Sequence, residues 1–346
     1  MHVPDGFIDA PISAATGVVA AAAVAVSLRG ARRELDERTA PLAGLVAAFI
    51  FAVQMLNFPV AAGTSGHLLG GALAAILVGP YTGVLCVSVV LLMQGILFAD
   101  GGLTALGVNI TDMAVVTTVV AYAVFRGLVK VLPRKRGSIT AASFVAAVLS
   151  VPAAAVAFTL IYAVGGTTDV SIAKVATAMI GVHVLIGIGE AVITALTVGA
   201  VIAVRPDLVY GARGLQQKLK LRVDGQLVDV PAEPAPVTAR SHRKVWITGL
   251  VTSLVLAGFV SFYASADPDG LEKVAADKGI DAKTERHATA DSPLADYGVK
   301  DVEDARLSGG LAGVIGVGVT VVAGSTVFWA VRRRRTADTT PVGTGV

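Results

Sequence analysis

Long uninterrupted apolar runs most constrain what this chain can fold into. Several of them exceed the roughly 18 apolar residues that a helix needs to cross a bilayer. Hydrophobic residues make up 54% of the sequence and charged residues only 15%, whereas about a quarter of the residues in soluble domains are charged. The sequence therefore predicts an all-α integral membrane protein that crosses the membrane many times.

The runs predict about nine transmembrane segments in two groups. The first group has seven helices and the second has two. The polar stretch between the groups contains PAEPAP and is typical of a linker. The third run is short and glycine-rich, so its boundaries are the least defined. The predicted spans lie at about 10–28, 41–60, 67–78, a run that reaches 98 after a turn at 79–83, 106–128, 139–164, 172–204, 245–263 and 307–331.

Basic residues cluster in alternate loops and predict the orientation. Most of the 28 Lys and Arg residues follow the first, fifth and seventh runs or lie in the C-terminal tail. The loops after the second and fourth runs hold none. Because short cytoplasmic loops are enriched in Lys and Arg, the basic loops and the C-terminus are expected in the cytoplasm. Nine spans then place the N-terminus outside.

The first two residues, Met1 and His2, carry a possible metal chelate. A free α-amine, the backbone nitrogen of His2 and its imidazole can close two fused rings around one divalent ion. Three nitrogens in a plane suit Ni(II) or Cu(II), with Co(II) possible. Residues 1–9 contain two acidic residues and no Lys or Arg, unlike the basic start of a secretory signal, so we expect Met1 to be retained.

His67, in the segment GTSGH at 63–67, is the candidate for the fourth nitrogen ligand. By chemistry alone, a histidine at position 2 more often has no metal role. The predicted topology changes that balance, because it places His67 and the N-terminus at the same outer face. If His67 is not a ligand, His183 or Asp5 must take its place.

Further polar residues have two interpretations each. His183 and Glu190 lie two turns apart on one face of the run at 172–204, where they either line a metal path or bond to a neighbouring helix. A second set of residues either orients the ligating imidazoles or makes ordinary helix contacts. That set comprises Thr64, Ser65, Gln94, Asn109 and Asp112.

Several classes of function are excluded. No GxxxxGK[ST] motif occurs, so the chain is not expected to hydrolyse ATP itself. The single cysteine, Cys86, excludes a multi-thiolate zinc or iron–sulfur site. The net charge is only +3 and the basic residues lie in loops, so no nucleic-acid partner is expected.

Four motifs together resemble the CbiM/NikM family of substrate-capture (S) components of cobalt and nickel energy-coupling factor (ECF) transporters. They are MHVPDGF at 1–7, GTSGHLLGG at 63–71, MQGILFADGGLTALGVNITDM at 93–113 and HVLIGIGEA at 183–191. The resemblance covers about 1–210. It implies that the Met1 amine, the His2 amide nitrogen and imidazole, and His67 bind the metal.

The region at 245–331 resembles a PDGLE module, which in related systems is a separate NikN- or CbiN-like subunit. It contains PDGLE at 268–272 and SPLADYG at 292–298. The resemblance implies two spans joined by an extracytoplasmic loop at 264–306. The stretch at 211–244 is then a cytoplasmic linker and 332–346 a disordered cytoplasmic tail. The PDGLE module is not expected to supply a metal ligand.

The family implies partners: a transmembrane coupling (T) protein and two cytoplasmic ATPase subunits in the plasma membrane. The predicted function is capture of Ni(II) or Co(II) outside the cell and its import, with the metal as substrate and no resident cofactor. One alternative is an S component for an organic micronutrient, although aromatic residues make up only 5% of the chain. A membrane metalloenzyme ranks lower, because four nitrogens leave no open position in the metal plane.

Overall fold

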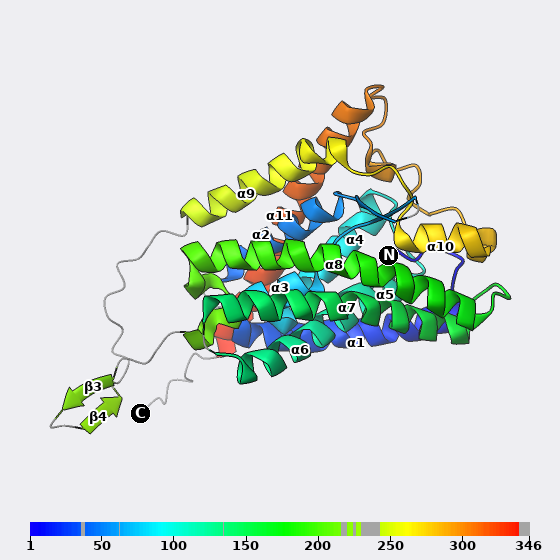
Figure 1. The fold of residues 1–346 in the computed structure, drawn as a ribbon. Coiled ribbons are helices and arrows are strands. Elements are labelled where there is room, and N and C mark those ends of the chain that lie inside the picture. The colour runs from blue at the N-terminus through cyan, green and yellow to red at the C-terminus, as the bar shows by residue number, and fades with distance from the viewer. Residues whose placement is uncertain are drawn as a thin grey trace, which may run out of the picture.

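Helices running side by side form the body of the protein (Figure 1). The computed structural model describes residues 1–35, 39–61, 63–133, 135–215, 220–223, 226–229 and 243–338. Within these residues, seven helical segments are long and apolar enough to cross a membrane, in agreement with the predicted multi-pass helical fold. They are α1 (Ala10–Glu34), α4 (Pro80–Leu97), α5 (Leu106–Asn109) with the π-helix η1 (Ile110–Val116) and α6 (Thr117–Val131), α7 (Arg136–Gly165), α8 (Ile172–Val204), α9 (Arg243–Gly258) with η4 (Val260–Tyr263), and α11 (Ala305–Asp338).

The second predicted span is shorter as a helix than its apolar run suggested. The helix α2 (Thr39–Gln54) ends well before residue 60, and Phe58–Ala61 form the strand β1. Pro59 prevents the helix from continuing to residue 60, because proline has no amide donor and disfavours helix in the residue before it. β1 pairs with β2 (Thr64–Gly66) as a short antiparallel ribbon. The all-α prediction missed this ribbon.

The third predicted span is also shorter than expected. The helix α3 (Gly71–Val78) begins only after Gly70, whose φ of 91° lies in the left-handed region that favours glycine. All of its residues are buried, and it packs against α2, α4, α6, α7 and α8. The longer helices therefore surround α3.

The C-terminal helices pack on the first part of the chain through α2. Both α9 and α11 contact α2 (Figure 1). Gly44 of α2 lies so close to Ser325 of α11 that a β-carbon at Gly44 would overlap the serine. The loop between α9 and α11 contains α10 (Gly270–Lys278), which packs against α8. Short 3₁₀ turns complete the described elements: η2 (Pro206–Leu208), η3 (Tyr210–Leu215), η5 (Ile280–Lys283) and η6 (Ala295–Tyr297).

The predicted linker and tail contain regular structure that the sequence did not suggest. Within 211–244, the strands β3 (Lys220–Val223) and β4 (Gln226–Asp229) pair as an antiparallel hairpin. PAEPAP lies outside the described residues. The helix α11 continues to Asp338, so the prediction of a disordered tail is wrong for 332–338, and 339–346 lie outside the described residues. The stretch of arginines extends the helix because arginine is a strong helix former.

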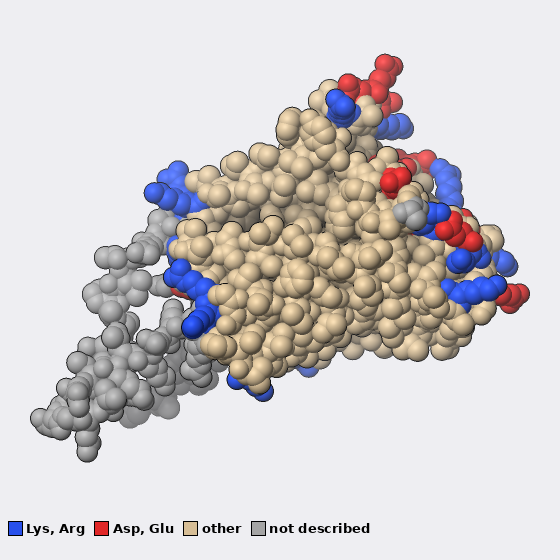
Figure 2. All heavy atoms as spheres, viewed as in Figure 1, with Lys and Arg blue, Asp and Glu red and all other residues tan. Residues whose placement is uncertain are grey.

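Charged residues occupy the two ends of the bundle in the view of Figure 2. A broad band between the ends shows neither basic nor acidic side chains. The acidic side chains visible in this view gather mainly at the end that holds α10 and the neighbouring loop. An apolar band between two charged ends is the surface that a bilayer requires of a spanning helix bundle.

Candidate metal centre

The N-terminal segment is held inside the molecule. Met1 and Val3 are buried, at 3% and 0% exposure. The backbone of Val3 is clamped by Asn109, which accepts from Val3 N at 2.7 Å and donates to Val3 O at 3.1 Å. Asp5 accepts a hydrogen bond from Thr104 N at 2.8 Å. These bonds hold residues 1–5 in one conformation, with the α-amine facing inward.

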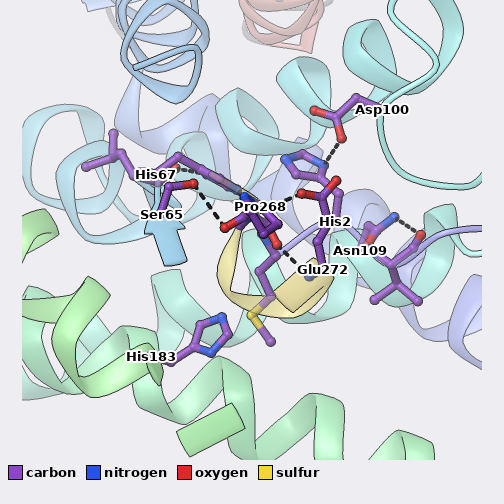
Figure 3. A network of polar contacts seen from close by, with 12 residues as sticks. His2, Ser65, His67, Asp100, Asn109, His183, Pro268 and Glu272 are labelled. Atoms are coloured by element: carbon purple, nitrogen blue, oxygen red, sulfur yellow. Dashed lines mark hydrogen bonds and ion pairs between the residues drawn. The ribbon is translucent and has the colours of Figure 1, made fainter. Parts of the chain in front are cut away.

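The structure brings the three predicted ligand residues together (Figure 3). The nitrogen of the Met1 amine lies 2.8 Å from His67 Nε2. The rings of His2 and His67 have their centroids 5.2 Å apart. His67 follows directly after β2, so the β1–β2 ribbon positions its imidazole. Residues 66 positions apart thus meet at one buried point.

The imidazole of His67 presents a lone pair to this point. His67 Nδ1 lies 3.0 Å from Leu68 O; it must carry the proton and donate, because a carbonyl only accepts. His67 Nε2 is then free to accept. His2 Nδ1 is buried without a hydrogen-bond partner among the described residues. Burial lowers the pKa of His2 to about 4, although Asp100 partly opposes this shift, so His2 is neutral near pH 7.

Asp269 of the PDGLE motif also reaches this point, and sequence reasoning missed it. Its Oδ2 accepts from the Met1 ammonium at 2.7 Å and lies 3.4 Å from His67 Nε2. Burial acts to raise the pKa of Asp269, but the Met1 ammonium and His67 hold it well below its ordinary value. The capping pattern Asp-x-x-Glu at 269–272 was a usable signal, because it fixes an aspartate at a helix N-terminus.

The PDGLE loop is docked onto the β1–β2 ribbon beside the ligands. Ser65 N donates to Pro268 O at 2.9 Å, and Ser65 Oγ donates to Asp267 O at 2.7 Å. Ser65 therefore holds the loop, a role that sequence reasoning did not anticipate. Gly270 lies so close to α8 that a β-carbon there would come within 2.8 Å of Ile186 and 3.3 Å of His183.

A cavity of about 670 Å³ opens beside the centre, between the N-terminal segment and the PDGLE module. His2, His67 and Asp269 line its inner side. Asp100 lies across from His2, with Oδ1 3.6 Å from Nδ1, and its Oδ2 accepts from Tyr297 at 2.5 Å. Gln94 is buried next to Tyr297. Tyr297 therefore lies between the cavity and Gln94 of α4.

Glu190 and His183, the two candidates in α8, have different hydrogen-bond partners. Glu190 accepts from Leu69 N at 2.7 Å and from Gly70 N at 3.2 Å, so it holds the backbone that follows His67. His183 Nδ1 lies 2.7 Å from Met179 O, and within the described chain its Nε2 has no hydrogen-bond partner.

Asp112 and Thr64, two of the candidates for orienting the ligating imidazoles, have different hydrogen-bond surroundings. Asp112 is buried in the π-helix η1, and its two carboxylate oxygens have no hydrogen-bond partner in the part of the chain that the structure describes. Thr64 is buried in β2, where it pairs with Ala61. Neither Asn109 nor Thr64 bonds to a ligand imidazole in any contact described here; Asn109 instead fixes the backbone next to His2.

Backbone nitrogens are essential to this centre. Over the described ranges, no group of three or more His, Cys, Asp or Glu side chains has an arrangement suited to a metal ion. A metal site at the two imidazoles would need the Met1 amine and the adjacent amide nitrogen as further ligands. A search restricted to side chains would overlook it.

Two different family models match the two parts of the chain. Residues 2–208 match the family model described as the cobalt uptake substrate-specific transmembrane region, and residues 243–333 match the PDGLE domain. A putative fused nickel transport protein NikMN of Archaeoglobus fulgidus is 38% identical over 66% of this chain and 75% of its own length. A cobalt transport protein CbiM of Sorangium cellulosum is 34% identical over 60% of this chain and 94% of its own.

A solved structure of a truncated transition metal transporter is similar in fold. It aligns with a TM-score of 0.52 and 27% identity over 59% of this chain and 99% of that one. The family model covers more than half of this chain and contains the motifs that hold His2 and His67. The chain therefore belongs to the CbiM family, with a PDGLE domain fused to its C-terminal side.

Proposed function

We propose that this protein captures Ni(II) or Co(II) at its outer face and imports it as the S component of an ATP-driven ECF transporter. The observation that carries the proposal is the buried Met1 amine 2.8 Å from His67 Nε2, with the imidazole of His2 beside them. Relatives named as nickel and cobalt transport proteins support metal uptake.

The spacing of the nitrogens suits a planar metal site. Two neighbouring ligands of a square plane, each about 2.0 Å from the metal, lie about 2.8 Å apart. The Met1 amine and His67 Nε2 have this separation. His2 Nδ1 and the His2 amide nitrogen belong to the same chelate and fill the other two positions. All-nitrogen planar coordination favours nickel over cobalt.

The proposed transport role also requires a defined membrane topology and partner subunits. We propose nine membrane-spanning segments, with α2 and α3 counted as short ones inside the bundle, an outer N-terminus and a cytoplasmic C-terminus. A T protein and two ATPase subunits in the plasma membrane would supply the energy. The basic C-terminal end of α11 supports this orientation.

One observation favours the alternative of an organic micronutrient. Phe98, Phe262 and Tyr297 are among the residues that line the cavity, and aromatic side chains bind organic ligands well. The carboxylates and imidazoles of the same cavity favour a cation. Mass spectrometry of ligands that copurify with the protein distinguishes the two.

The central experiment measures metal binding by the purified full chain with a native N-terminus. Titration calorimetry and elemental analysis should give one Ni(II) or Co(II) per chain. His67→Ala should lose tight binding, because it removes a ligand. His287→Ala is the matched control, since His287 lines the same cavity without contacting the amine in any bond described here. Full metal stoichiometry in His67→Ala would refute this site. Competition between the two ions decides the preferred metal.

A further inference from the structure

We propose that Asp269 of the PDGLE motif is itself a ligand of the captured metal, so that the C-terminal module completes the site. The proposal rests on the function proposed above, with Met1, His2 and His67 as nitrogen ligands. It adds an oxygen ligand from a different part of the chain.

The position of Asp269 Oδ2 suits an axial ligand. An oxygen about 2.1 Å above a metal whose planar nitrogens are about 2.0 Å away lies about 2.9 Å from each nitrogen. Oδ2 lies 2.7 Å from the Met1 nitrogen and 3.4 Å from His67 Nε2. These two distances bracket the expected value, so a small shift of the carboxylate brings it onto the metal.

The carboxylate is already oriented for this role. Asp269 Oδ1 accepts from Glu272 N at 2.9 Å, and Glu272 Oε2 accepts from Asp269 N at 2.9 Å, which forms a capping box at the start of α10. One oxygen is thereby fixed by the helix and the other faces the amine. Metal-binding carboxylates are commonly held by such outer hydrogen bonds.

Charge balance at this buried point also favours a carboxylate. A divalent ion bound to one deprotonated amide leaves one net positive charge, and an unpaired charge in a buried place is costly. The Asp269 carboxylate cancels it. In the structure the same carboxylate pairs with the Met1 ammonium, and the two groups are 0% and 11% exposed. The Met1–Asp269 pair is thus neutral in this state, and a divalent ion bound to one deprotonated amide and the Asp269 carboxylate would be neutral as well.

The test compares Asp269→Ser with Asp267→Ser in the full chain with a native N-terminus, loaded with Ni(II). Serine keeps the helix cap but is uncharged and too short to reach the metal. Asp267 is exposed and bonds to Ser265, so its variant controls for changes in the loop. X-ray absorption reports the ligand shell, and magnetic susceptibility separates planar from five-coordinate Ni(II).

We expect the native protein and Asp267→Ser to hold paramagnetic Ni(II) with nitrogen and oxygen ligands. Asp269→Ser should hold diamagnetic, four-nitrogen Ni(II), with affinity at least about 10-fold lower. A four-nitrogen shell in the native protein would overturn the Asp269 proposal and leave the proposed function standing, even if the affinity of the variant fell. Failure of the native protein to bind Ni(II) or Co(II), or binding that does not need His67, would instead refute the proposed function.

Discussion

An extension of the N-terminus is predicted to abolish tight metal binding, although it leaves both imidazoles in place. A peptide bond turns the Met1 amine into an amide, which is a poor donor and cannot close the first chelate ring. The amine is also enclosed, 2.7 Å from Asp269 Oδ2 and 2.8 Å from His67 Nε2. An added residue would have to displace the groups that now surround it.

Two separate losses set the size of the effect. Removal of a group that only orients a metal ligand lowers affinity about 10- to 100-fold, and removal of a ligand should cost at least the upper value. The extension also removes the ammonium that compensates Asp269. Breaking a buried ion pair costs about 3–5 kcal/mol. We therefore expect the PDGLE loop to loosen as well, with lower thermal stability of the metal-free protein.

Calorimetric titration with Ni(II) measures the first loss, and thermal unfolding in detergent measures the second. A protein extended by a Gly-Ser segment of several residues is compared with one that carries the same segment at its C-terminus. A single added residue is unsuitable, because its own amine, two amide nitrogens and the His2 imidazole could close a new four-nitrogen chelate. Equal Ni(II) affinity in the extended and control proteins would refute the amine as a ligand.

Four further predictions test other parts of the centre. Folding lowers the pKa of His2 from 6.5 to about 4, so the unfolded protein takes up a proton at His2 first as the pH falls. The free energy of unfolding should therefore drop by about 3 kcal/mol between these two pH values. His2→Gln should flatten this dependence of the unfolding temperature on pH. Metal binding by native protein should also weaken below neutral pH, because the amine and amide must lose protons; a pH-independent affinity in calorimetry would contradict this. Asn109→Leu should release the Val3 backbone and reduce Ni(II) affinity about 10- to 100-fold without loss of fold; unchanged affinity would exclude Asn109 from positioning His2. Glu190→Leu should leave two buried amides unpaired and cost about 1–3 kcal/mol each in unfolding free energy, which chemical denaturation can measure.

The apolar runs were sufficient to predict most of the long helices. Hydrophobicity over a window of residues reports burial in lipid or protein, so α7 and α8 follow from it directly. It does not report where a helix stops inside an apolar run. Pro59 keeps α2 from continuing to residue 60, and the late start of α3 depends on Gly70. Both details are local backbone chemistry rather than composition.

The sequence also predicts part of the candidate centre, namely the part that depends on neighbouring residues and on topology. Met1 and His2 are adjacent, so their chelate follows from covalent geometry. His67 could be added because topology placed it on the same face. Asp269 lies 268 positions from Met1, and the docking of the PDGLE loop on Ser65 and of α10 on α8 brings the two together. Contacts of that kind depend on tertiary packing, which single-sequence reasoning does not reach.

The shortness of α3 limits how far the candidate centre lies from the other end of the bundle. The helix has 8 residues, about 12 Å at 1.5 Å per residue, and the four residues 67–70 add at most about 14 Å. The chain then turns at Gly79, against the carboxylate of Glu34 at the end of α1. His67 is thus within about 26 Å of that end, less than the roughly 30 Å of a hydrocarbon core. An ion bound at His67 would therefore lie closer to that end of the bundle than the thickness of one hydrocarbon core.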